Sequence, residues 1–208
     1  MYLSVLIVAV GWWHVLAIDG GRRWQIYLSK PLTLLLIISL AFEYRGLDQD
    51  GSHAWILLGL MLSLAGDILL MLPADRFLHG LLAFLVAHLC YLVGFSQGPL
   101  VLHLLDALLL LAPAAVLFGL LWRPMGVWRL PVLIYTLTLI GMTWFAAGAW
   151  RASLAVGSAA ALVGSLLFLF TDAMIAIRRF HGAFRFANGL IMMSYFSAQF
   201  LVAASLAG

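Results

Sequence analysis

Long apolar runs occupy almost all of this 208-residue chain, and they constrain its fold more than any other feature. Short stretches of Gly, Pro and charged residues interrupt the runs and leave eight segments that could form helices. Most segments are close to the ~20 residues that an α-helix needs to cross ~30 Å of hydrocarbon. We expect helices near residues 2–18, 30–45, 53–72, 77–96, 100–121, 130–149, 153–177 and 185–206.

The composition excludes a soluble domain. Hydrophobic residues make up 65% of the chain and charged residues only 9%, whereas soluble domains are ~25% charged. A chain of this length cannot bury so many apolar side chains in one core, so lipid must cover part of its surface. We therefore predict an all-α integral membrane protein with eight transmembrane helices, in a single domain over residues 1–208. Because no basic stretch precedes the first run, we expect a retained helix there rather than a cleaved signal peptide.

The basic residues are divided unevenly between the two sets of loops. Only Arg45 and Arg151 fall in even-numbered loops. Since basic loops stay in the cytoplasm, we expect both termini outside the cell (inner) membrane. The net charge of +3 is interpreted in the same way, because no basic run with interleaved aromatic residues indicates nucleic-acid binding. The nine residues assigned to odd-numbered loops are Arg22, Arg23, Lys30, Arg76, Arg123, Arg129, Arg178, Arg179 and Arg185.

A weak internal repeat suggests a duplication. Pro31 and Pro131 are expected to open the second and sixth helices, about one hundred residues apart. Residues 1–98 and 99–208 would then be parallel four-helix repeats, related by an axis along the membrane normal. Chance matches in a biased composition are the alternative. The other matching stretches are Asp67 with Arg76-Phe77-Leu78-His79-Gly80, and Asp172 with Arg179-Phe180-His181-Gly182.

Three acidic residues lie well inside apolar runs: Asp67, Asp106 and Asp172. An ionised carboxylate in hydrocarbon costs roughly 2.5–3.5 kcal/mol or more, so each is a candidate functional residue. Asp67 and Asp172 each lie about five residues before the cytoplasmic end of a helix, which puts them ~7–8 Å below the same surface. They could therefore face one cavity, although hydrogen bonds between packed helices would also account for them. Asp106 is near the outer end of its helix, and we expect a structural role.

Polar side chains recur along single faces of other helices. Phe84, His88 and Tyr91 follow one another at three- and four-residue steps. Asn188, Tyr195 and Gln199 form a similar stripe in the last helix, where hydrogen bonding between helices is the alternative interpretation, above all for Gln199. Further polar candidates are Ser63, Tyr135 and Thr171, whereas Gly157, Ala161 and Gly164 form a small-residue face that indicates close packing.

These motifs resemble the YhhN-type lysoplasmalogenase family. The resemblance covers most of the chain and is strongest over residues 30–95 and 164–180. Thr171 stands where the family usually has Ser, and a hydroxyl is retained. The resemblance implies a multi-pass hydrolase that cleaves the vinyl ether of lysoplasmalogens to a fatty aldehyde and a glycerophospho-base. The motifs are Lys30-Pro31-Leu32, the stretch from Ser63 to Leu72 with Pro73, Phe77-x-x-Gly80-x-x-Ala83-Phe84-x-x-Ala87-His88-x-x-Tyr91, and Phe168-x-x-Thr171-Asp172-x-x-x-Ala176.

The implied reaction suits a pair of carboxyl groups. Protonation of the vinyl ether β-carbon gives an oxocarbenium ion, which water then attacks. One protonated and one ionised carboxyl could divide this work, as in glycoside hydrolysis. We expect Asp67 and Asp172 to be this pair on the cytoplasmic side. The supporting residues would be His88, Tyr91, Ser63, Thr171, Tyr135, Asn188 and Tyr195, and the substrate-binding residues Lys30, Arg178, Arg179 and Phe84.

Two other functions remain compatible with the sequence. A lipid or small-molecule transporter or flippase would use parallel repeats and polar groups near the midplane. A zinc-dependent membrane hydrolase could draw on Asp67, His79, His88 and Asp172, but no HxxxH or HExxH pair occurs. We therefore expect no metal or other cofactor. The expected partners are a lysophospholipid substrate and membrane lipid, with no nucleic acid, and the oligomeric state is not indicated.

Overall fold

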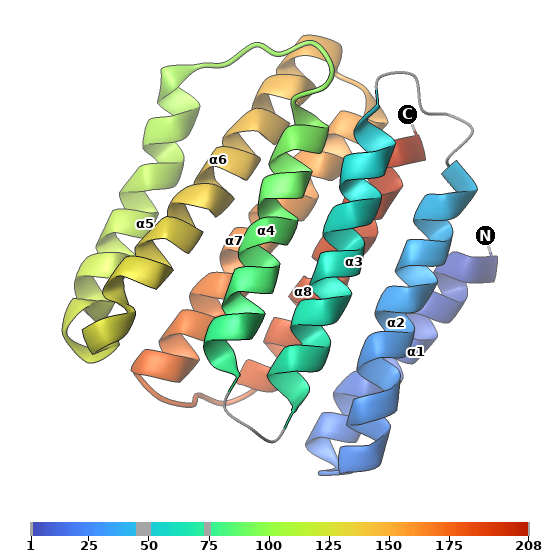
Figure 1. Cartoon of the computed structure of the whole chain (residues 1–208), viewed down its shortest axis with the longest axis vertical. Coiled ribbons are helices and arrows are strands. Elements are labelled where there is room, and N and C mark those ends of the chain that lie inside the picture. The colour runs from blue at the N-terminus through green and yellow to red at the C-terminus, as the bar shows by residue number, and fades with distance from the viewer. Residues whose placement is uncertain (1, 45–50, 73–75, 208) are drawn as a thin grey trace.

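Eight long α-helices build the protein (Figure 1), whose computed structural model describes residues 2–44, 51–72 and 76–207. Short 3-10 turns at Gly126–Trp128 and Ser205–Ala207 complete the described secondary structure, which contains no strand. Arg45 and Pro73, used in the sequence analysis, lie outside the described residues. The helices are α1 (Tyr2–Asp19), α2 (Arg23–Glu43), α3 (Ser52–Met71), α4 (Phe77–Phe95), α5 (Leu104–Met125), α6 (Arg129–Ser153), α7 (Val156–Phe180) and α8 (Ala187–Ala204).

The helices are long and apolar enough to cross a membrane. The described residues contain seven such helical runs, and one of them, Leu104–Ser153, has 50 residues. This run holds both α5 and α6, which fold back on each other in Figure 1. Gly126 lies in the turn between them with a φ of 49°, a conformation that glycine adopts without a steric penalty. The predicted all-α membrane protein with eight helices is confirmed.

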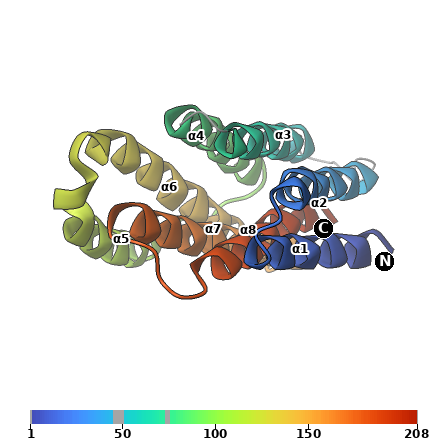
Figure 2. The ribbon, with the colours of Figure 1, turned by 90° about the horizontal axis from the view of Figure 1, so that it is seen from below.

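The helices pack in two uneven layers. Seen along their axes in Figure 2, α3 and α4 lie on one side, and α5, α7, α8 and α1 form a row on the other. The α2 and α6 helices connect the layers, since α2 contacts both α3 and α8, and α6 contacts both α4 and α7. Gly164, on the predicted small-residue face, is buried against α8, where an added Cβ would lie 3.1 Å from the Ala198 carbonyl oxygen. The predicted close packing is thereby confirmed.

The predicted start of the second helix is wrong. A start at Lys30 was expected because proline favours a first helical turn, but α2 begins at Arg23 and Pro31 lies inside it. The first turns of α2 are more polar than the apolar run that follows, and they are nevertheless helical in a helix that packs against α1 and α8. The other predicted bounds fall within four residues of the observed ones. The two-repeat organisation stays a prediction, and Pro31 no longer supports it.

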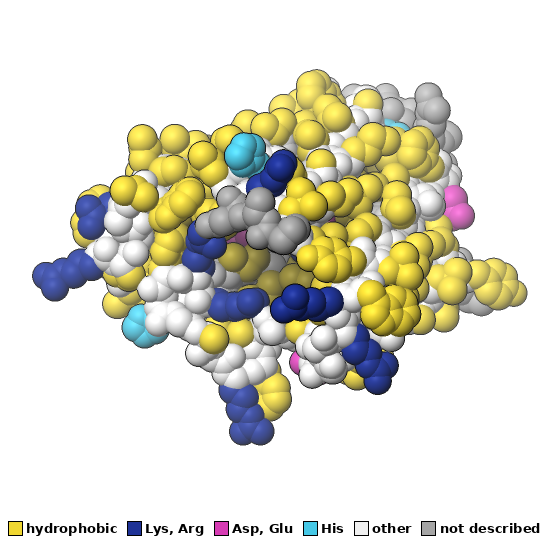
Figure 3. Space-filling model, turned by 60° about the horizontal axis from the view of Figure 1, so that its bottom comes forward, with side chains coloured by type: hydrophobic (Ala, Val, Ile, Leu, Met, Phe, Trp, Pro, Cys, Tyr) yellow, Lys and Arg dark blue, Asp and Glu magenta, His cyan; other side chains and the backbone are white. Residues whose placement is uncertain are grey.

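Basic side chains gather at the end of the bundle where the odd-numbered connections lie (Figures 1 and 3). With Lys30 inside α2, eight of the nine assigned residues belong to this end. At the other end, Arg151 is paired with Asp106 through two contacts, 2.9 and 2.7 Å long. This exposed pair agrees with the structural role expected for Asp106.

We expect a reporter that is active only outside the cytoplasm to function when it is fused after Gly208. The reason is the accumulation of arginine at the opposite end of the bundle, which the positive-inside rule keeps in the cytoplasm. The matched control carries the same reporter in the α5–α6 turn, after Val127, and should be inactive. Activity of the control and silence of the C-terminal fusion would reverse the orientation.

Candidate functional site

Asp67 forms a buried ion pair with Lys30. The carboxylate comes from α3 and the ammonium from α2, and their side chains are 1% and 11% exposed. The Lys30 Nζ lies 2.8 Å from Oδ1, at an angle outside a regular hydrogen bond. The Tyr195 hydroxyl donates to Oδ2 at 2.9 Å. A buried charge needs such partners, and Asp67 obtains them from two other helices.

A chain of hydrogen bonds extends from this pair through the centre of the bundle. Gln199 donates from Nε2 to the Tyr195 hydroxyl at 3.1 Å. Its Oε1 accepts from the Tyr91 hydroxyl at 2.8 Å, and the Tyr91 and Ser63 hydroxyls are 3.2 Å apart. All of these side chains are buried. The network therefore joins α2, α3, α4 and α8 around Asp67.

The expected position of Lys30 at the cytoplasmic interface is wrong. Lys30 lies in the second turn of α2, and its ammonium group pairs with the Asp67 carboxylate instead of facing a site where a phosphate could bind. Gln199 forms the hydrogen bond between helices that its alternative interpretation predicted, because it accepts from Tyr91 of α4, and it is the central member of the network. Its position four residues after Tyr195 was the available signal, because that spacing places both side chains on one helical face.

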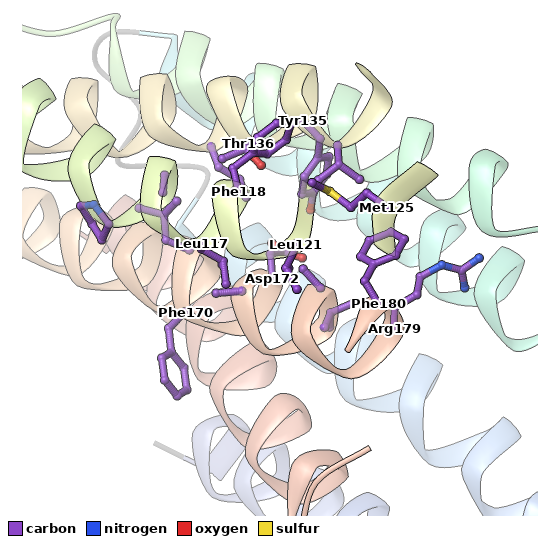
Figure 4. A pocket seen from close by; sticks show the side chains of 18 of the residues that line it. Leu117, Phe118, Leu121, Met125, Tyr135, Thr136, Phe170, Asp172, Arg179 and Phe180 are labelled. Carbon is purple, nitrogen blue, oxygen red and sulfur yellow. The ribbon is translucent and has the colours of Figure 1, made fainter. Parts of the chain in front are cut away.

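Asp172 belongs to a separate part of the protein, a cavity of about 480 Å³ between α4, α5, α6 and α7 (Figure 4). Its volume lies in the range that small-molecule sites occupy. Most of the lining is Leu, Phe and other apolar residues, with polar groups from Asp172, Tyr135, Thr136 and Arg179. Tyr135 of α6 and Asp172 of α7 line this cavity together. The cavity thus combines one carboxyl group with a long apolar surface.

Arg179 lies at the basic end of this cavity. Its guanidinium is 3.5 Å from the centre of the Phe77 ring and 5.6 Å from that of Trp128. Figure 3 shows basic side chains around a hollow in this face of the molecule. Arg178 is exposed and does not line the cavity. Of the two arginines expected to bind phosphate, the structure brings only Arg179 to the cavity.

His88 separates the cavity from the buried network. Its ring makes edge contacts with Phe168, Tyr135 and Tyr91, with centroids 4.8, 5.5 and 5.9 Å apart. The imidazole is fully buried, and neither ring nitrogen has a hydrogen-bond partner among the described residues. Phe84 stacks on the same ring and packs over Gly66, so it does not line the cavity. His88 therefore contacts one residue of the cavity lining, Tyr135, and one residue of the network, Tyr91.

The remaining predicted residues lie apart from the cavity. The Thr171 hydroxyl bonds the Ser194 hydroxyl at 2.7 Å, in the interface between α7 and α8. Thr171 is buried there and does not line the cavity, although it precedes Asp172. Asn188 is half-buried in the first turn of α8, about two turns before Tyr195.

The two acidic residues lie at different distances from the ends of their helices. Asp67 is four residues from the end of α3, or ~6 Å, whereas Asp172 is eight residues from the end of α7, or ~12 Å. The difference arises because α7 continues as a helix through Arg178 and Arg179, beyond the apolar run. The described cavity is lined by Asp172 and not by Asp67. The two carboxyl groups thus face different surroundings across the His88 ring.

These features define a multi-pass helical membrane protein with a cavity that carries a carboxyl group inside the bundle. Residues 25–206 match the YhhN family, and the chain belongs to that family. It is 30% identical to the Escherichia coli O6:H1 protein called uncharacterized membrane protein YhhN, over 99% of both chains.

Two mammalian relatives carry the name of an enzyme. The chain is 35% identical to pig lysoplasmalogenase TMEM86B, over 90% of this chain and 77% of the relative. It is 34% identical to human lysoplasmalogenase TMEM86A, over 90% of this chain and 80% of the relative. No solved structure matches the chain.

Proposed function

We propose that this protein is an intramembrane hydrolase that cleaves the vinyl ether bond of lysoplasmalogens, releasing a fatty aldehyde and a glycerophospho-base. The names of its mammalian relatives support this substrate class. The observation that carries the proposal is the cavity itself, with Asp172 on its wall, Arg179 at its basic end and apolar residues beyond. Asp172 would face the vinyl ether bond of the substrate, Arg179 its phosphate, and the apolar residues its hydrocarbon chain.

The spacing along α7 fits one substrate molecule. Asp172 and Arg179 are seven residues apart, so their backbones are separated by ~10 Å along the helix. In the substrate about seven bonds join the phosphorus to the vinyl ether β-carbon, which spans ~9 Å at ~1.3 Å per bond. A phosphate held by Arg179 therefore places the reacting carbon near Asp172.

Asp172 would donate the proton that starts the reaction. The proton passes from its carboxyl oxygen to the β-carbon, and the electrons of the double bond form the new C–H bond. Water adds to the oxocarbenium carbon, and the proton that it loses returns to the Asp172 carboxylate. The resulting hemiacetal then divides into the aldehyde and the alcohol. Among the described residues no Lys or Arg forms an ion pair with Asp172, which favours the protonated carboxyl that this step needs.

Asp67 would be the ionised member of the predicted pair of carboxyl groups. Its pairing with Lys30 favours the charged form. It lies in the network behind His88 and outside the cavity lining, so we assign it to electrostatic support and positioning rather than to contact with the substrate. The network would hold Tyr91, and through it the His88 ring against Tyr135. The division of work between the two carboxyls is a proposal that mutagenesis can test.

Purified protein should release fatty aldehyde from a lysoplasmalogen and no fatty acid from the ester-linked lysophospholipid with the same headgroup. Only the vinyl ether becomes an oxocarbenium ion when a carbon atom is protonated. Extensive chelation should leave the rate unchanged, since no group of three or more His, Cys, Asp or Glu side chains among the described residues could hold a metal ion.

Three outcomes of this assay would redirect the proposal. Fatty acid from the ester substrate would indicate an esterase. Loss of activity together with one bound zinc ion per chain would favour the metal-dependent hydrolase. Movement of the lipid between leaflets without either product would favour a transporter.

A further inference from the structure

The cavity around Asp172 has one closed wall and one open wall. The closed wall belongs to the core, where Met125, Leu139 and Leu121 are only 1%, 2% and 4% exposed. On the other side Leu109 of α5 is 63% exposed and Leu166 of α7 is 43% exposed, although both also line the cavity. The cavity therefore opens sideways between α5 and α7, on a surface that faces lipid.

Small side chains keep the space between these two helices wide. Ala114 of α5 and both Ala173 and Ala176 of α7 line the cavity. Phe170 has its ring turned outward at the same edge, away from Asp172 (Figure 4), and is 41% exposed. At the outer edge of the bundle, α5 packs against α6 and more sparsely against α7 (Figure 2).

We infer that the gap between α5 and α7 is a lateral portal, through which the hydrocarbon chain of the lipid substrate passes from the bilayer to Asp172. The inference rests on the proposed function, which supplies the single-chain lipid as the occupant. The opening is continuous with the surfaces that carry Asp172 and Arg179. A chain that moves sideways stays in an apolar medium, whereas each methylene that leaves lipid for water lowers the equilibrium constant about fourfold.

The portal also limits how much of the chain the protein contacts. Leu166 is six residues from Asp172, or ~9 Å along α7, which corresponds to about seven carbon atoms at ~1.3 Å per bond. The chain beyond that point would remain in the bilayer. The structure thus assigns specificity to the headgroup, the vinyl ether and the first part of the chain, and little to the total chain length.

Ala114→Phe narrows the portal, and Ala115→Phe is its matched control. Ala115 is the next residue of α5, is exposed, and does not line the cavity. Ala114→Phe should lower kcat/KM for a long-chain lysoplasmalogen at least ~10-fold, a typical effect of overpacking. It should change kcat/KM less than ~3-fold for an analogue with a four-carbon chain, which does not reach the bilayer. Ala115→Phe should leave both substrates unaffected.

A binding measurement tests the portal without relying on turnover. A lysophosphocholine with a diazirine near the middle of its chain should label peptides of α5 and α7 in the wild-type protein. Ala114→Phe should reduce this labelling and Ala115→Phe should not. Labelling confined to other helices would overturn the portal. So would an Ala114→Phe variant that lowers kcat/KM equally for the long-chain and four-carbon substrates, or that lowers it for neither. If the wild-type protein is labelled on α5 and α7 but releases no aldehyde, the proposed reaction is contradicted and the portal is still supported.

Discussion

Asp172→Asn should lower turnover by at least ~100-fold, the low end of general acid catalysis. The amide nearly matches the carboxyl in shape, but it has no proton that it can give to the β-carbon. Asp172 faces the cavity and forms no ion pair with a described residue, so the variant leaves no charge unpaired and should remain folded. The rate of aldehyde release by purified protein in detergent or vesicles is the measurement.

Asp106→Asn is the control for this variant. Asp106 is also an acidic residue of a transmembrane helix, but it pairs with exposed Arg151 at the opposite end of the bundle. Its replacement should leave turnover within about twofold of wild type, because exposed ion pairs contribute ~0–1 kcal/mol to stability. A folded Asp172→Asn variant that keeps a third or more of wild-type turnover would remove Asp172 from the reaction.

Lys30→Met should strongly destabilise the protein. The substitution leaves the Asp67 carboxylate buried without its cation, and breaking one side of a buried pair typically costs about 3–5 kcal/mol. We expect the melting temperature in detergent to fall by ~10 °C. Asp67→Asn added to Lys30→Met removes the remaining charge and should recover most of that loss. Arg151→Met is the matched control, and the loss of its exposed ion pair should lower the melting temperature by only a few degrees.

The double variant also reports what the pair of Lys30 and Asp67 does for catalysis. Its core should be folded and its charge pair absent, so any loss of turnover belongs to the missing Lys30–Asp67 pair and not to instability. We expect turnover at least ~10-fold below wild type, because preorganised charge in a dry interior stabilises a developing cation. The changes in melting temperature caused by Lys30→Met alone and by Asp67→Asn alone should not add up in the double variant. If they do add, the ion pair between Lys30 and Asp67 contributes no coupling energy.

The helices could be predicted well from the sequence, because a long apolar run must satisfy its backbone hydrogen bonds internally once it lies in lipid. Each run between charged stretches became one helix, and only the start of α2 was misplaced. That error had a consequence for the site. Once Lys30 was assigned to a loop, a solvent-exposed phosphate ligand was the natural interpretation, whereas the helix turns its side chain inward to Asp67.

The polar residues of the site were easier to find than to place. Asp67, Tyr91, Tyr195 and His88 stand out because polar groups inside apolar runs are rare, and all four lie in the core. Which of them share a cavity depends on the rotation of each helix and on where it ends. The distance of Asp172 from the end of α7 could not be read from the apolar run, because α7 extends past that run into the basic residues.

The central claim is that the reaction begins with protonation of the vinyl ether β-carbon, and the mass of the aldehyde released in heavy water tests it most directly. Exchangeable carboxyl protons become deuterons in this solvent, so donation from Asp172 should place one deuterium on the carbon next to the aldehyde group. A control sample of unlabelled aldehyde, incubated with the Asp172→Asn variant, corrects for exchange after release. An enzymatic product with one deuterium at that carbon is the predicted result. Aldehyde without deuterium there, or no aldehyde at all, would contradict the mechanism.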